Sequence, residues 1–527
     1  MKSLDLGDFS RKFVANTFFN VLGRSWSFLI NLLLTPYILS RLNVADFGAW
    51  VLLTILINTF NLLDLGLGFA FVRYIAAYHT YDDYENINRV IFSGLVFYGL
   101  LGIVGIVAGL LVQRPLLELL RITASNNTYL LVLLTCAVSN IGAMYLSVLK
   151  GMQRMDKQNS IEVAMSVLNV IGTVCFLEAG FGIFGLALNA LMNAVLNIGL
   201  SFVTVKRAAP EISLGWNFDR KLLREMFGYG LKISVSRIGN LICFQADKLI
   251  VSRVLGLAAV SFYEVAARMA AFMRAVPLVL LSALIPATSE LGARKDENKI
   301  ELTYWMVSKY IVILTVAAVA FLVLNATSIV RLWLGEGFEQ SAVLIQVLAI
   351  GYGVNILGGA ASQIGAGVGR PEFDMHSTIL LSIANPILSF LLVRRFGAPG
   401  AAAGTSIALI SAAIYLLFSF HKNYLRTSVW RLFDSIYIRP ICAAILTVSV
   451  LIAVRHLIPG LIGLSEVRYL LAIRLAVDFV IFLPSYLVLL VALRQVSTID
   501  WKNFLWLLTF GLEFLRHQFR DRAKAYW

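Results

Sequence analysis

Residues 232–274 read KISVSRIGNLICFQADKLIVSRVLGLAAVSFYEVAARMAAFMR. Two apolar segments of membrane-spanning length lie in this stretch, and together they carry seven charged residues. A charged side chain at the centre of a spanning helix costs roughly 2.5–3.5 kcal/mol, even on a lenient insertion scale. A hairpin that accepts this cost repeatedly is expected to enclose a polar cavity that handles a charged compound. The seven charges are Lys232, Arg237, Asp247, Lys248, Glu264, Arg268 and Arg274.

The composition predicts an integral membrane protein. Of the 527 residues, 59% are hydrophobic and only 14% are charged, whereas soluble domains carry about 25% charged residues. The net charge of +14 could suit nucleic acid, but in a multi-span protein basic residues gather in cytoplasmic loops, so no nucleic-acid partner is expected. The four cysteines lie inside apolar runs without metal-ligand spacing, and no metal or cofactor is predicted.

Apolar runs long enough to cross a bilayer occur about fourteen times along the chain. The sequence therefore predicts an all-α polytopic fold with short connecting loops and no soluble domain. The expected spans are roughly 13–39, 47–72, 90–112, 128–149, 161–179, 183–205, 228–252, 260–285, 304–325, 342–366, 377–395, 401–420, 438–455 and 469–493.

The distribution of lysine and arginine predicts the orientation. One set of alternating loops is much richer in basic residues than the other, so the positive-inside rule puts both termini in the cytoplasm, as an even number of spans requires. We expect four parts: an N-terminal six-helix lobe (1–207), a C-terminal six-helix lobe (208–421), two additional transmembrane helices (422–495) and a cytoplasmic amphipathic tail (496–527).

An internal repeat supports the division into two lobes. The stretch SRLNVADFGAW (40–50) follows the first span, and SRVLGLAAVSFY (252–263) follows the seventh with one extra residue. Arg24 and Arg237 fall at nearly the same offset in these two spans. Six spans separate the copies, so the repeat is parallel, with an axis along the membrane normal and the substrate path between the halves.

The charged residues inside the spans are the candidate site. Helical spacing puts Asp247 on one stripe of the seventh span and Arg237 and Lys248 on the adjacent stripe. Glu264 and Arg268 are four residues apart and can pair directly. These charges either bind cargo or only pair with one another to orient helices, and the residues leave both readings open.

The first half contributes a matching set of charges. Arg24 lies mid-span, and Asp64 precedes Arg73 by about two and a half helical turns. Asp64 could bind a proton or could be a structural partner of Arg24 or Arg73. We therefore predict a cationic lumen for an anionic headgroup, formed by Arg24, Arg73, Arg237, Lys248, Arg268 and Arg274. Ion coupling or structural pairing is assigned to Asp64, Asp247 and Glu264.

Several short motifs resemble those of a known transport family. In the first half they are YILSRL (37–42), FGAW (47–50), LLDLGLG (62–68) and VRYIA (72–76); in the second half they are DKLIV (247–251), LG (255–256) and VSFY (260–263). They resemble the polysaccharide-transport family, the Wzx-type lipid-linked oligosaccharide flippases of the MOP superfamily. That family more usually has a glycine where this chain has Ser261.

The resemblance implies a two-lobed fold of about twelve core helices plus two more. It also implies alternating-access export of undecaprenyl-pyrophosphate-linked sugar repeat units, such as O-antigen or exopolysaccharide units, across a bacterial inner membrane. Implied partners are membrane lipids, H⁺ or Na⁺ as coupling ion, and polysaccharide polymerase or assembly proteins. The basic residues fit this cargo, because arginine is the preferred partner of a compact diphosphate anion.

Two alternative functions remain. A drug or small-cation antiporter of the same superfamily would share the span count, but the excess of arginine over carboxylate in the lumen argues against cationic cargo. A membrane glycan polymerase, ligase or glycosyltransferase would need a long acceptor loop, or a carboxylate or metal cluster at the membrane surface. The sequence has neither, so we expect a transporter and not an enzyme.

Overall fold

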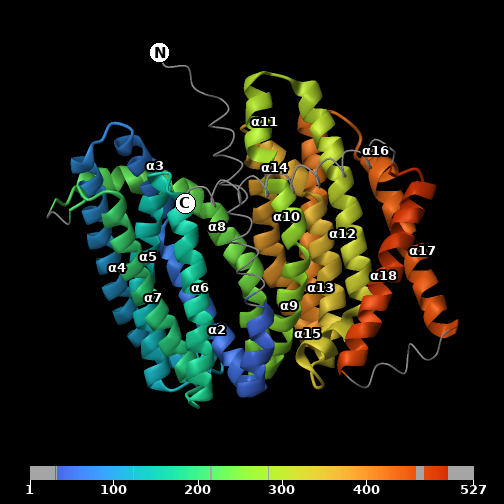
Figure 1. Ribbon diagram of the computed structural model, residues 1–527, viewed down its shortest axis with the longest axis horizontal. Coiled ribbons are helices and arrows are strands. Elements are labelled where there is room, and N and C mark those ends of the chain that lie inside the picture. Colours follow the sequence, from blue (N-terminus) through green and yellow to red (C-terminus); the bar gives the residue numbers. More distant parts are fainter. Residues whose placement is uncertain are drawn as a thin grey trace, which may run out of the picture.

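The computed structural model describes residues 30, 32–122, 124–213, 217–282, 284–457 and 468–496. Within these ranges every regular element is a helix, which confirms the predicted all-α class. Two helical bundles lie side by side, with α8 between them and α17 and α18 at the outer edge of the second bundle (Figure 1). Most of the first predicted span and nearly all of the predicted tail lie outside the described residues.

The first bundle follows a helical stretch at residues 32–41. Some of its helices begin at polar caps: the Asn43 side chain accepts the Asp46 amide at the start of α2, and the Ser125 side chain accepts the Thr128 amide at the start of α5. The elements are α2 (Val44–Asn61), the 3₁₀ turn η1 (Leu62–Asp64), α3 (Leu67–His79), α4 (Tyr84–Leu119), α5 (Asn126–Gly151), α6 (Met155–Glu178) and α7 (Gly182–Ala208).

The second bundle contains longer and more interrupted helices. Its elements are α8 (Arg220–Leu255), α9 (Leu257–Met273), α10 (Ala275–Ser282), α11 (Leu284–Ala293), α12 (Glu297–Leu334), α13 (Glu339–Leu357), α14 (Gly359–Gly367) and α15 (Glu372–Phe420). The chain continues through η2 (His421–Leu425), α16 (Val429–Leu432), η3 (Phe433–Tyr437), α17 (Ile438–Leu457) and α18 (Arg468–Ala492).

Ten stretches of the described chain are long and apolar enough to cross a membrane. One of them, Glu372–Leu425, contains two of the predicted spans. The two spans are joined within α15 at a bend at Gly397, which has a φ of 63°. The charged helix α8 is not among the ten. The multi-span character is confirmed, whereas the count of fourteen and the part boundaries at 207, 421 and 495 remain predictions.

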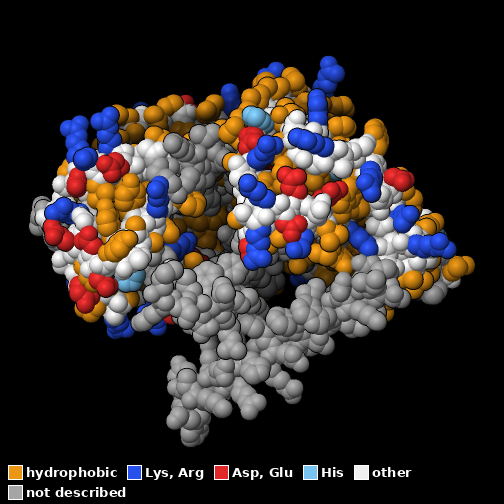
Figure 2. Space-filling model, turned by 90° about the horizontal axis from the view of Figure 1, so that it is seen from above, with side chains coloured by type: hydrophobic (Ala, Val, Ile, Leu, Met, Phe, Trp, Pro, Cys, Tyr) orange, Lys and Arg blue, Asp and Glu red, His pale blue; other side chains and the backbone are white. Residues whose placement is uncertain are grey.

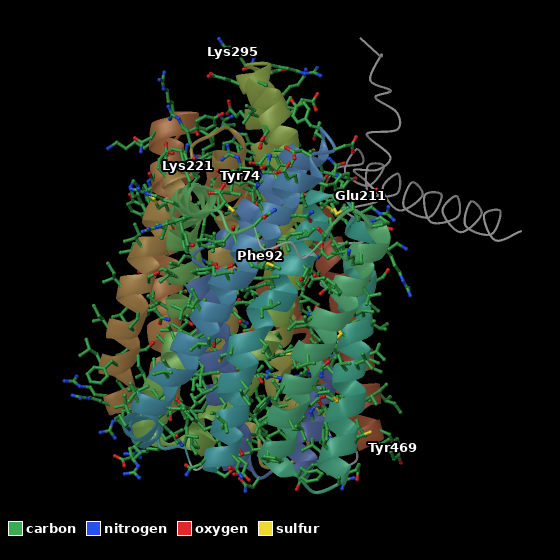
Figure 3. All side chains as sticks on the ribbon, turned by 90° about the vertical axis from the view of Figure 1, so that its left-hand side faces the viewer. Tyr74, Phe92, Glu211, Lys221, Lys295 and Tyr469 are labelled. Carbon is green, nitrogen blue, oxygen red and sulfur yellow. The ribbon has the colours of Figure 1, made fainter. Side chains whose placement is uncertain are left out.

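The two ends of the bundles carry the loops that the predicted topology assigns to opposite sides. Glu211, Lys221 and Lys295 lie toward one end of the molecule, and Tyr469 lies at the other (Figure 3). Lys and Arg side chains are frequent on the first of these ends, which Figure 2 views face on. The positions of these residues agree with the predicted order of loops on the two sides. The assignment of the basic end to the cytoplasm stays a prediction.

The two bundles contact each other at the two repeat segments, residues 40–50 and 252–263. The Ser261 hydroxyl of α9 donates to the Val44 carbonyl, and Gly48 of α2 packs against the Leu257 carbonyl of α9. A second close approach brings Gly66 against Gly230 of α8. Both contacts depend on glycine, because a Cβ atom would enter the space of the opposing backbone. The cavity described next lies on the second-bundle side of this junction.

Helix α8 packs against both bundles. Near its start, the Phe227 ring stacks edge-on against Phe97 of α4 with ring centroids 4.9 Å apart. Toward its other end, α8 packs along α15, and Asn385 donates to the Cys243 carbonyl at 2.6 Å. One continuous helix therefore links the first bundle to the wall of the cavity.

Candidate functional site

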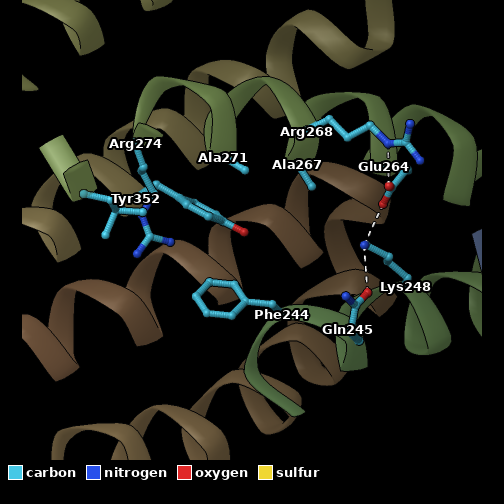
Figure 4. Close-up of a pocket in the computed structure, with 10 residues that line it drawn as sticks. Phe244, Gln245, Lys248, Glu264, Ala267, Arg268, Ala271, Arg274 and Tyr352 are labelled. Carbon is cyan, nitrogen blue, oxygen red and sulfur yellow. Dashed lines mark hydrogen bonds and ion pairs between the residues drawn. The ribbon is translucent and has the colours of Figure 1, made fainter. Parts of the chain in front are cut away.

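A cavity of about 400 Å³ lies among α8, α9, α10 and α13. Charged and aromatic side chains line it together, which is unusual for a space inside apolar helices. Figure 4 shows these side chains converging from their helices. The lining residues are Phe244, Gln245, Lys248, Glu264, Ala267, Arg268, Ala271, Arg274, Leu278 and Tyr352.

One carboxylate in this cavity is shared by two cations. Lys248 Nζ lies 2.6 Å from Glu264 Oε2, and Arg268 Nε lies 2.7 Å from Glu264 Oε1 (Figure 4). Lys248 also donates to Gln245 Oε1 at 2.8 Å. The predicted Glu264–Arg268 pair is thus present, and Lys248 joins it from the neighbouring helix. The Lys248 and Glu264 side chains are each only 9% exposed, so the bilayer does not contact them freely.

Arg268 also connects the cavity to the first bundle. Its Nη1 donates to Thr35 Oγ1 at 2.8 Å, and its guanidinium lies 5.6 Å from the centroid of the Phe47 ring. Thr35 belongs to the helical stretch 32–41, and Phe47 belongs to α2. A change in the ion pair of Arg268 would therefore alter contacts in both bundles.

Arg274 has no carboxylate partner among the residues that the structure describes. Its guanidinium is held between two aromatic rings, 5.5 Å from the centroid of Phe244 and 5.0 Å from that of Tyr352. Nη2 donates to Asn355 Oδ1 at 3.3 Å, whereas the buried Nε has no partner in the described chain. The cavity therefore contains three basic side chains and one carboxylate, and the unpaired positive charge is at Arg274.

Asp247 lies next to Lys248 in sequence but outside the cavity. Its carboxylate is 2% exposed and accepts four neutral donors: Tyr263 Oη at 3.0 Å, Ser389 Oγ at 2.8 Å, Thr405 Oγ1 at 2.8 Å and Asn385 Nδ2 at 3.2 Å. No basic side chain of the described residues lies within ion-pair distance of it. In the described chain, hydrogen bonds from neutral groups stabilise this buried carboxylate, and no basic side chain balances its charge.

Two of the other predicted site residues, Asp64 and Arg73, do not line the cavity. Asp64 is buried in η1, where its Oδ1 accepts the Gly66 amide at 2.9 Å and holds a turn in which Leu65 and Gly66 have positive φ. Arg73 is exposed on α3. Arg24 lies outside the described residues, and Arg237 lies on α8, but its side chain is not described. The role of these residues in binding therefore stays a prediction.

Sequence reasoning missed the aromatic walls of the site and a second charged cluster. Phe244 and Tyr352 gave no signal, because aromatic residues are common throughout apolar spans. Arg455 and Asp478, by contrast, form an ion pair at 2.6 Å between α17 and α18. A carboxylate inside the apolar run 469–493 is the same anomaly that marked residues 232–274, so the rule used there could have found it.

The family of this chain follows from its similarity to known proteins. Residues 38–343, more than half of the chain, match the family described as polysaccharide biosynthesis protein. The chain belongs to the polysaccharide biosynthesis protein family. A putative O-antigen transporter of Shigella flexneri is 22% identical over 417 residues, which cover 76% of this chain and 96% of that protein. The resemblance inferred from the motifs is confirmed.

One further relative and two solved structures are also similar to this chain. A probable low-salt glycan biosynthesis flippase of Haloferax volcanii is 23% identical over 54% of this chain and 58% of that protein. The lipid II flippase MurJ in an inward closed conformation superposes with a TM-score of 0.68 at 15% identity, over 90% of this chain and 99% of that one. An inward-facing multidrug MATE transporter of the MOP superfamily gives 0.64 at 20% identity, covering 78% and 96%. These relatives are named as a transporter and a flippase, and the two solved structures share the fold of this chain.

Proposed function

We propose that this family member is a flippase for lipid-linked oligosaccharide. It moves an undecaprenyl-pyrophosphate-linked O-antigen or exopolysaccharide repeat unit from the cytoplasmic to the periplasmic leaflet of a bacterial inner membrane. The observation that carries the proposal is Arg274, a buried guanidinium in a cavity without a carboxylate partner in the described chain. The names of the O-antigen transporter and glycan flippase relatives support the same cargo class.

The chemistry of the cavity suits a diphosphate. Arg274 offers a planar set of N–H donors between two rings that keep it in place, and arginine binds phosphate oxygens in pairs. A diphosphate that arrives there would also compete with Glu264 for Lys248 and Arg268. A cationic drug would meet an excess of positive charge, so the antiporter alternative is disfavoured by the same residues.

Transport would proceed by alternating access of the two bundles. The lipid tail stays among the membrane lipids while the sugar headgroup crosses through the cavity, so no apolar chain has to enter a polar space. Arg268 contacts both bundles through Glu264 and Thr35, which makes it a natural link between headgroup binding and bundle movement.

Ion coupling is proposed at Asp247 and not at Glu264. Two cations already neutralise Glu264, so a proton or Na⁺ there would have to displace an ion pair. Among the described residues, Asp247 has only neutral partners, and oxygen atoms of Ser389 and Thr405 lie against its carboxylate. A buried carboxylate in an oxygen-rich setting can take up H⁺ or a hard cation such as Na⁺ and lose its uncompensated charge.

The deciding experiment is removal of the gene followed by extraction of lipid-linked sugars. A flippase mutant should accumulate complete repeat units on the cytoplasmic side of the membrane. A mutant of a glycosyltransferase should accumulate truncated units instead, and the proposal would then be wrong. Drug sensitivity of the same strain, with normal polysaccharide export, would point to the antiporter alternative.

The mutant strain also tests the predicted lumen. Replacing Lys248 or Arg237 with a neutral residue should impair export while expression is preserved. Full export by both variants would remove these two residues from the binding role.

A further inference from the structure

Uncharged residues line the part of the cavity that lies between its two groups of charges. Arg268 extends toward Glu264 on one side, and Arg274 lies on the opposite side (Figure 4). Along α9 these two arginines are about 9 Å apart, at 1.5 Å per residue. Ala267 and Ala271 lie between the two groups of charges, and their small side chains leave this interval open.

Two neutral polar groups face this open interval. The Tyr352 side chain of α13 is only 6% exposed, and its hydroxyl has no hydrogen-bond partner among the described residues. Gln245 Oε1 accepts from Lys248 at 2.8 Å, which leaves Nε2 on the side toward Phe244 (Figure 4). Nε2 also has no partner in the described chain. Because polar groups in buried places are normally paired, both groups are available to a bound compound.

The chemistry of these groups suits a sugar ring. A tyrosine hydroxyl donates or accepts one hydrogen bond, and a glutamine amide nitrogen donates two, so both can pair with sugar hydroxyls. The Phe244 ring, whose centroid lies 5.8 Å from that of Tyr352, supplies an apolar wall. Ligand pockets typically combine such walls with a few polar groups that fix the orientation of the ligand.

The charge of the cavity indicates that this sugar is neutral. Among the described lining residues, Lys248, Arg268 and Arg274 exceed the carboxylate of Glu264 by two positive charges, three minus one. The diphosphate of the proposed cargo has one negative charge on each phosphate and balances this excess. An acidic sugar would therefore place a further carboxylate near Glu264 without a counter-charge, which is costly in a buried space.

We propose that Tyr352 and Gln245 bind the neutral sugar that is attached directly to the diphosphate. This sugar occupies the space beside Ala267 and Ala271, while Arg274 binds the phosphates. The inference rests on the flippase function proposed above and specifies which part of the cargo is recognised. A cavity of about 400 Å³ is near the lower end of the range for small-ligand pockets, so the remaining sugars of a repeat unit lie outside it.

The test measures the affinity of the purified full-length protein in detergent for four lipids with the same polyprenyl chain. One is the bare polyprenyl diphosphate, and the others carry glucose, N-acetylglucosamine or glucuronic acid on it. The wild type should bind at least one neutral-sugar lipid more tightly than the bare lipid. The glucuronic acid lipid should gain nothing over the bare lipid. The deciding quantity is the ratio of the affinity for the neutral-sugar lipid to that for the bare lipid.

Tyr352→Phe should lower this ratio about two- to tenfold, because it removes one hydrogen bond to the sugar and keeps the ring beside Arg274. Ala271→Leu should also lower the ratio, since the larger side chain fills the open interval. Ala258→Leu is the matched control, because Ala258 is exposed on the same helix, and its ratio should equal that of the wild type. Arg274→Gln should weaken binding of every lipid by a similar factor, since each carries the diphosphate.

The outcomes separate this inference from the function on which it rests. If the wild type binds the bare lipid and both neutral-sugar lipids equally, the sugar site is wrong and the diphosphate site stands. An unchanged ratio in both Tyr352→Phe and Ala271→Leu would also overturn the sugar site, as would tightest binding of the glucuronic acid lipid. If none of the four lipids binds, the proposed flippase function is rejected together with the sugar site.

Discussion

At the scale of single residues, the site depends on how each charge is compensated. Among the described residues, Glu264 forms ion pairs with two cations, and Asp247 accepts hydrogen bonds from four neutral donors. Arg274 lies against two aromatic rings and donates to one amide oxygen. These three environments assign three different roles. A neutralised pair holds helices together, a carboxylate among neutral donors can exchange a cation, and a cation without a counter-charge can receive an anion.

The first residue-scale prediction concerns Arg274. Arg274→Gln should lower export and weaken binding of a polyprenyl pyrophosphate by about tenfold or more, because hydrogen bonds to a charged group contribute about 1.5–3 kcal/mol. Complementation of the deletion strain and binding to purified protein measure the two effects. Arg294→Gln, in an exposed pair with Glu290 on α11, is the control and should behave like the wild type. Normal export by Arg274→Gln at normal expression would refute the role.

The second residue-scale prediction concerns Glu264. Glu264→Gln leaves Lys248 and Arg268 close together without their shared carboxylate, so the folded state should lose about 3–5 kcal/mol. Thermal unfolding in detergent measures the loss. Adding Lys248→Met should restore part of it, whereas Glu290→Gln on the surface should change stability by no more than about 1 kcal/mol. Unchanged stability of Glu264→Gln would mean that water and not the carboxylate compensates the two cations.

At the scale of elements, the crossing of α2 and α9 joins the bundles through equivalent positions of the repeat. Gly48 and Ser261 occupy matching places in the two copies, and each faces the backbone of the other helix. Gly48 leaves room for the Leu257 carbonyl, while the Ser261 hydroxyl donates to the Val44 carbonyl. The serine at position 261 therefore keeps the close approach and adds a hydrogen bond to it.

The element-scale prediction concerns this crossing. A Cβ atom at position 48 would overlap the Leu257 carbonyl, so Gly48→Ala should disfavour the state in which α2 and α9 are packed by about 1–3 kcal/mol. Cysteine pairs introduced across the crossing should then cross-link more slowly. Gly99→Ala is the matched control, because nothing lies within 4 Å of its added Cβ. Equal cross-linking in both variants would contradict the predicted overlap at position 48.

At the scale of the whole molecule, the cavity belongs to the second bundle and reaches the first through Arg268 and Thr35. Its charge also determines how the membrane potential acts. With the cytoplasm negative, each negative charge that moves outward releases about 2.3 kcal/mol per 100 mV. A diphosphate that crosses while the basic side chains stay in place is therefore driven partly by the potential itself.

The whole-molecule prediction separates this potential from ion coupling. In vesicles containing the purified protein, flipping of a fluorescent lipid-linked sugar should accelerate with the potential and with a proton or sodium gradient. Asp247→Asn should abolish the response to the ion gradient and retain the response to the potential, because the cargo charge is unchanged. If flipping is unaffected when the potential and both gradients are collapsed, the coupling proposal is wrong.

The amino-acid sequence was sufficient to predict the membrane-spanning character, the repeat, the family and which charges lie inside apolar segments. All of these follow from local properties: hydropathy over about 20 residues, helical spacing and short motifs. The Glu264–Arg268 pair was predictable for the same reason, because residues four apart on a helix are neighbours.

Which charges share the cavity depends on how separate helices pack. Asp247 and Lys248 are adjacent in sequence, but successive helical residues point about 100° apart. The first therefore meets α15 and Tyr263, whereas the second meets Glu264. The aromatic rings around Arg274 come from α8 and α13, so the rotation and packing of separate helices determine that contact. Local pattern fixes which residues lie in a helix, and packing fixes what each side chain meets.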